Sequence, residues 1–107
     1  MTFDPEVIFD KLESASSALV MAMEIKLKAE KALERAEDTA YSVAKAAGIS
    51  IEDAKRGART DPLAIKLFED YVTAEKDYKR ALYRYDNWKI LAECRRTQEA
   101  SLRYLTK

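Results

Sequence analysis

The sequence of 107 residues contains no histidine, one cysteine, two glycines and two prolines. The missing histidine removes the commonest general base and metal ligand of proteins. One cysteine cannot form an internal disulfide or a thiolate zinc site, and two glycines cannot build a phosphate-binding loop. The remaining residues do not assemble into an acid, a base and a nucleophile. We therefore expect a protein that is not an enzyme, with no catalytic residues, cofactor, bound metal or small-molecule substrate.

Long apolar runs are also missing. No run approaches the length that a membrane span needs, and the first six residues lack the basic and apolar segments of a signal peptide. A chain of this length can bury one modest core. These features predict a soluble, cytoplasmic protein that forms a single helical domain over residues 1–107 and does not contact a membrane.

What the chain has in abundance is helix-forming residues. Apolar residues make up 48% of the sequence and charged residues 36%. Alanine, leucine, lysine, glutamate and arginine are prominent, and these are the strongest helix formers. The composition predicts an all-α fold.

Capping signals divide the chain into three helices. Asp4-Pro5 and Asp61-Pro62 each combine an N-cap residue with proline at the first helical position. Gly48 is a natural residue to end the first helix, and Ser50 begins a capping box. The sequence therefore predicts long helices over about 5–46 and 62–104, joined by an elbow with a short helix over about 51–57, which stops near Gly57.

Apolar residues recur at alternating spacings of three and four in both long helices, as in a coiled coil. The first helix has Ile8, Leu12, Ala15, Leu19, Ala22, Ala29, Leu33, Ala36, Ala40 and Val43, and the second has Leu67, Tyr71, Ala74, Tyr78, Ala81, Tyr85, Trp88 and Ala92. This pattern predicts an antiparallel, coiled-coil-like helical hairpin. Folding at residues 48–61 pairs positions whose numbers sum to about 110, which sets Trp88 opposite Ala22.

A second apolar stripe lies beside the first on both helices. It includes Met21, Ile25, Phe68, Val72 and Leu82. An exposed apolar stripe of this size is unusual for a monomer. We expect these residues to mediate self-association into a homo-oligomer or binding to a protein partner.

The balanced charge of 19 acidic and 19 basic residues is distributed unevenly. The first half of the chain is acidic, whereas basic residues concentrate after residue 75. Helical spacing groups Lys76, Lys79, Arg80, Tyr83 and Arg84 on one face, and Arg95, Arg96 and Arg103 continue the basic strip. Such a strip would bind an acidic partner or the backbone of a nucleic acid, with Tyr83 stacking on a base. Alternatively, these basic residues only pair with Glu75, Asp77, Asp86 and the acidic first helix.

The segment Trp88-Lys89-Ile90-Leu91-Ala92-Glu93-Cys94, on a long C-terminal helix that ends in basic residues, resembles the C-terminal helix of the phage UvsY-type recombination mediators. These are small helical proteins that oligomerise and help to load a recombinase onto single-stranded DNA. The resemblance implies oligomerisation and contact with single-stranded DNA.

Two functions follow as expectations. The first is a non-enzymatic helical interaction protein of a phage or bacterium, which self-associates and binds a protein partner as an adaptor, accessory or inhibitor. The alternative is an accessory protein of the recombination-mediator type that binds single-stranded nucleic acid through the basic strip.

Overall fold

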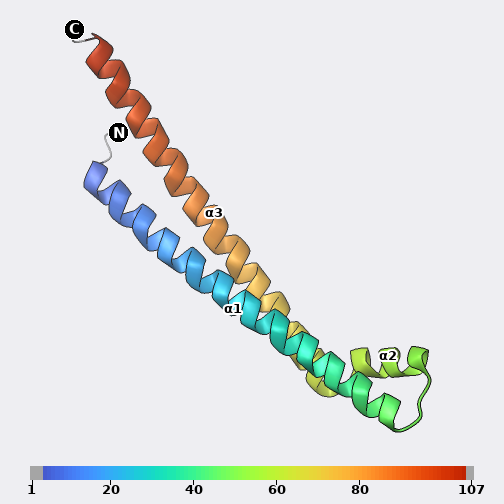
Figure 1. Ribbon diagram of the computed structural model, residues 1–107. Coiled ribbons are helices and arrows are strands. Elements are labelled where there is room, and N and C mark those ends of the chain that lie inside the picture. Colours follow the sequence, from blue (N-terminus) through green and yellow to red (C-terminus); the bar gives the residue numbers. More distant parts are fainter. Residues whose placement is uncertain (1–3, 106–107) are drawn as a thin grey trace. The chain divides into compact units, whose positions relative to one another are not determined.

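Three α-helices follow one another in the computed structural model, which describes residues 4–105 (Figure 1). Helix α1 comprises Pro5–Ala46, α2 comprises Ile51–Thr60 and α3 comprises Pro62–Leu105. These residues include no strand, so the all-α class predicted from the sequence is confirmed. The bounds of the two long helices agree with those predicted to within one residue. The predicted domain limits at residues 1 and 107 lie outside the described residues.

Helix α2 is longer than predicted. It continues through Gly57 to Thr60, and the Thr60 hydroxyl donates to the carbonyl oxygens of Arg56 and Gly57. Gly57 does not adopt a positive φ, so it does not terminate the helix. The helix ends at Asp61, which is extended at ψ 132°, because a residue before proline disfavours the helical conformation.

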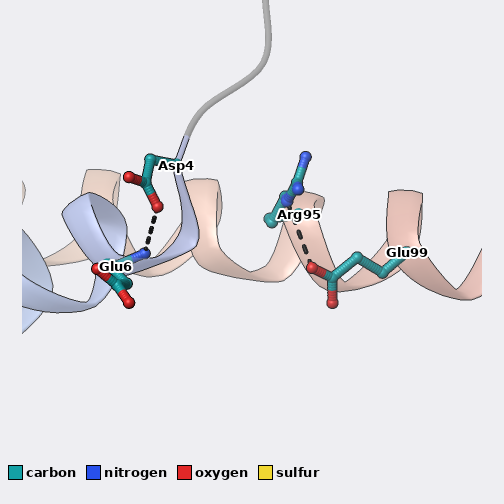
Figure 2. Close-up of polar contacts among 4 residues, drawn as sticks. All are labelled: Asp4, Glu6, Arg95 and Glu99. Carbon is teal, nitrogen blue, oxygen red and sulfur yellow. Dashed lines mark hydrogen bonds and ion pairs between the residues drawn. The ribbon is translucent and has the colours of Figure 1, made fainter.

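Side-chain caps satisfy backbone N–H groups at the start of each helix. Asp4 Oδ1 accepts from the Glu6 N–H at 3.0 Å, as Figure 2 shows, and Ser50 Oγ accepts from the Asp53 N–H at 3.3 Å. Asp61 Oδ2 accepts from two N–H groups of the first turn of α3, at 3.1 and 3.3 Å. These N–H groups have no partner within their own helix, which is why aspartate and serine mark helix starts.

Gly48 ends α1 in a complete Schellman motif. Its φ of +83° lies in the left-handed region that favours glycine. The Gly48 N–H donates to the Lys45 carbonyl and the Ile49 N–H to the Ala44 carbonyl, both at 3.1 Å. These two hydrogen bonds satisfy carbonyl groups that the helix would otherwise leave unpaired.

Contacts divide the described chain into two units. Among the described residues, the terminal unit contains residues 4–22 and 78–105, and the elbow unit contains residues 23–77. Each unit therefore combines a part of α1 with a part of α3, and α2 belongs to the elbow unit.

Within the elbow unit, α2 packs on its neighbours through alanine. Ala54 is fully buried and Ala58 nearly so. One hollow is lined by Glu37, Asp38 and Tyr41 of α1 and by Lys55, Ala58 and Arg59 of α2. Because these residues share a hollow, α2 lies against α1 five to nine residues before α1 ends, with acidic side chains of α1 beside basic ones of α2.

Shared hollows show which residues of the two long helices lie near one another within each unit. Trp88 lines a hollow with Ala15 and Ala18, whereas the prediction set it opposite Ala22. In the elbow unit, Val43 and Ala44 share a groove with Leu67, which the predicted pairing sets opposite them, and Ala40 and Leu63 line the same groove.

The core is small. The buried apolar residues among residues 4–105 are Ile8, Ala15, Ala54, Ala58, Ala64 and Ala74, and no polar or charged residue is buried with them. Ile8 is the one large side chain in this set. No helix within the described residues is both long and apolar enough to cross a membrane.

Candidate interaction surfaces

The residues predicted to mediate self-association differ in exposure. Met21, Ile25 and Phe68 are exposed, whereas Val72 and Leu82 are half-buried. Met21 and Leu82 belong to the terminal unit, and the other three belong to the elbow unit. The structure therefore brings Ile25, Phe68 and Val72 into one unit and Met21 and Leu82 into the other.

Most of the predicted basic strip lies on the surface of α3. Lys76, Lys79, Arg80, Tyr83, Arg84, Arg96 and Arg103 are all exposed. Lys76 belongs to the elbow unit and the others to the terminal unit. Tyr83 is 69% exposed, so its ring is available to a partner.

Arg95 lies apart from the exposed strip. Its side chain is 26% exposed, and its Nε lies 3.4 Å from Glu99 Oε1 (Figure 2). This Nε is buried and has no hydrogen-bond partner, so the contact with Glu99 is an electrostatic one without hydrogen-bond geometry. Arg95 follows Trp88 and Ala92 at the spacing of the apolar seam, and that position explains why it points away from solvent.

Phe9 projects from the terminal unit between two hollows. One hollow, of about 150 Å³, is lined by Pro5, Ile8, Phe9, Ala92, Arg95, Arg96 and Glu99. The other, of about 390 Å³, is lined by Phe9, Leu12, Glu13, Ser16, Ser17 and Tyr85. Phe9 is 59% exposed. The seam pattern does not include Phe9, because Phe9 lies one position beyond Ile8. Its aromatic side chain is the signal in the sequence that could have identified it.

A wider groove lies in the elbow unit. Its volume is about 870 Å³, and its apolar lining includes Ala36, Ala40 and Ala44 of α1 with Leu63 and Leu67 of α3. The alanines recur every four residues and therefore form one row along α1. Arg35 and Asp61 are the charged residues of the lining.

Side chains suited to metal binding do not cluster among the described residues. Residues 4–105 contain no cluster of three or more cysteine, aspartate or glutamate side chains placed to hold a metal ion. Cys94 is a free thiol exposed on α3.

Comparisons with protein-family models, with curated proteins and with solved structures found no match. The resemblance of residues 88–94 to the UvsY-type mediators therefore stays a prediction.

Proposed function

We propose that this chain is a non-enzymatic helical interaction protein that self-associates and, in the assembled form, binds a protein partner. The observation that carries the proposal is the contrast between a buried core of five alanines and one isoleucine and the many large apolar side chains on the surface. Met21, Ile25 and Phe68 are among the exposed ones. Burial of such side chains against a second chain is favourable because it removes apolar surface from water.

The exposed area supports the same proposal. The chain has an accessible surface of 8517 Å². A globular protein of its mass, 12.2 kDa, exposes about 6,000 Å². A stable interface buries about 800 Å² on each partner. The surplus is therefore larger than one standard interface would cover.

We further propose that the two long helices form an antiparallel hairpin within each unit. In the terminal unit, Ile8 shares a hollow with Arg95, and Ala15 shares another with Trp88. In the elbow unit, Ala40 shares a groove with Leu63. In the terminal unit, partner numbers on α3 fall as numbers on α1 rise, which is the relation expected of antiparallel helices.

The proposal predicts that thermal stability depends on protein concentration. A native oligomer is stabilised by mass action. The midpoint temperature of unfolding should therefore rise by several degrees when the protein concentration is raised from about 5 to about 500 µM. Circular dichroism at 222 nm across these concentrations measures the shift. A midpoint that stays constant would contradict self-association.

A second candidate function rests on the exposure of Tyr83 beside Arg80 and Arg84. Basic side chains that flank an exposed aromatic ring fit the phosphates and bases of single-stranded nucleic acid. We propose this as the alternative function, in line with the acidic partner or nucleic acid expected for the strip.

Charge reversal tests the alternative. Replacing both Arg80 and Arg84 by glutamate should weaken binding of a fluorescent oligothymidylate at low salt by about tenfold or more, and should reduce the salt slope by about 1.4. Fluorescence anisotropy measures both quantities. The matched control is Arg56→Glu with Arg59→Glu on α2, which should leave binding unchanged. Equal losses in both variants, or no binding by the wild type, would exclude this function.

A further inference from the structure

We propose that the face of the terminal unit around Phe9 binds the same face of a second copy of this chain, so that α1 of each copy lies along α3 of the other. This inference rests on the proposed self-association and names the surface that performs it. Four observations support it: the exposed Phe9, the hollows on either side of it, opposite charges on the two helices, and the surplus of exposed area.

The two helices of the terminal unit carry opposite net charge. Residues 4–22 contain four acidic residues and one basic residue, whereas residues 78–105 contain seven basic and three acidic residues. A second copy that placed α1 on α1 would bring like charges together. A copy that places α1 on α3 brings opposite charges together, and this arrangement satisfies both helices at once when the copies are related by a two-fold axis parallel to the helices.

Residue spacing places specific charges on this face. Glu6, Phe9 and Glu13 follow one another at spacings of three and four, so they share one side of α1. Glu13 lines the larger hollow beside Phe9, and Arg96 lines the smaller one. Lys89 lies seven residues before Arg96 and therefore on the same side of α3.

The pairing within the terminal unit predicts which charges meet between copies. Because Ala15 lies with Trp88 and Ile8 with Arg95, Glu13 and Lys89 lie at one level along the unit, and Glu6 and Arg96 at another. In the two-fold assembly Glu13 therefore meets Lys89 of the second copy, and Glu6 meets Arg96 of the second copy. Asp86 and Glu93 lie three residues before Lys89 and Arg96 and share that side of α3, while the other basic residues within residues 78–105 leave the helix with an excess of positive charge.

Phe9 supplies the apolar anchor of the same contact. A projecting ring beside two hollows on one face can enter the corresponding hollow of a second copy, because a two-fold interface uses the same surface twice. Its neighbour Arg96 lines the same hollow, so the guanidinium can lie against the ring of the incoming phenylalanine. Aromatic and arginine side chains are the residue types that most often dominate the affinity of such contacts.

Two variants that reverse one row of charges each provide the test. The first is Glu6→Lys with Glu13→Lys, and the second is Lys89→Glu with Arg96→Glu. Each variant alone should raise the dissociation constant of the assembly by roughly thirtyfold, since four contacts change from attraction to repulsion. An equimolar mixture should form mixed pairs, because the lysines of the first variant then meet the glutamates of the second. Sedimentation velocity of one labelled variant, alone and mixed, measures this.

The outcomes separate the inference from the proposal on which it rests. A wild-type chain that stays monomeric overturns the proposed self-association. A wild-type oligomer that either variant leaves intact, or that mixing fails to restore, keeps self-association and overturns the contact at this face. Restoration only when all four substitutions are in one chain would place the charge pairs within that chain and would also overturn it.

A second variant covers the case in which charge reversal disturbs folding, which circular dichroism would reveal. Phe9→Ala should weaken self-association about tenfold or more, because it removes the apolar anchor. The matched control is Ile90→Ala, which changes a side chain of similar exposure, 56%, on the outward side of α3. Equal effects of the two changes would overturn the proposed role of Phe9.

Discussion

Replacing Ile8 by alanine is expected to lower the free energy of unfolding by about 3 kcal/mol. Ile8 is 3% exposed and is the one large side chain among the buried residues of the described chain. Its removal costs the transfer free energy of three carbon atoms and leaves a cavity beside Ala92 and Arg95. Urea denaturation at fixed protein concentration, followed by circular dichroism, measures the loss.

The neighbouring residue gives a matched control for Ile8. Val7 is 47% exposed, so Val7→Ala should change the free energy of unfolding by about 0.5 kcal/mol or less. Both changes remove methyl groups and both introduce the same good helix former. Similar losses for the two variants would show that helix propensity, and not burial of Ile8 against α3, determines the effect.

Replacing Ala54 by aspartate should release α2 from the elbow unit. Ala54 is 0% exposed, and a carboxylate at this position would be buried without a partner. The cost of an unpaired buried charge is about 3 kcal/mol or more, which exceeds what a helix of ten residues gains by packing through two alanines. Amide hydrogen exchange of residues 51–60 should accelerate by about a hundredfold.

Arg56→Asp is the control for Ala54→Asp. Arg56 is exposed on the same helix, so the new carboxylate stays in water and exchange within α2 should change little. Exchange of residues 8–22 should stay unchanged in both variants because those residues belong to the terminal unit. Equal acceleration in the Ala54 and Arg56 variants would contradict the packing of α2 through Ala54.

The helix bounds could be predicted because their signals are local. Asp4 and Asp61 accept hydrogen bonds from the first turn of their own helices, and Gly48 supplies the positive φ that ends α1. Each of these signals involves residues within four positions of one another. Gly57 misled the prediction because glycine ends a helix only where the backbone adopts that positive φ, and here it does not.

The pairing of the helices could not be predicted from periodicity. A seam that repeats every seven residues buries the same positions when one helix slides by seven, so two pairings one heptad apart are equivalent in the sequence pattern. The contacts that decide between two such pairings join residues far apart in the sequence. The burial of Ala54 and Ala58 depends on contacts of this kind, which no local pattern specifies.

The candidate surfaces were predictable in part for a similar reason. Spacing alone identified Arg80, Tyr83 and Arg84 as an exposed group on α3. The same spacing grouped Arg95 with them, although its seam position brings it beside Glu99 and away from solvent. The role proposed for Phe9 depends on the hollows on either side of it, whose lining includes α3 residues far away in the sequence.

Sedimentation equilibrium of the wild-type chain tests the central claim most directly. Self-association predicts an average mass that rises with concentration from 12.2 kDa to about twice that value or more. The measurement should extend to roughly 500 µM, so that an interface with a weak dissociation constant of about 100 µM is still detected. A mass that stays at 12.2 kDa over this whole range would contradict the account.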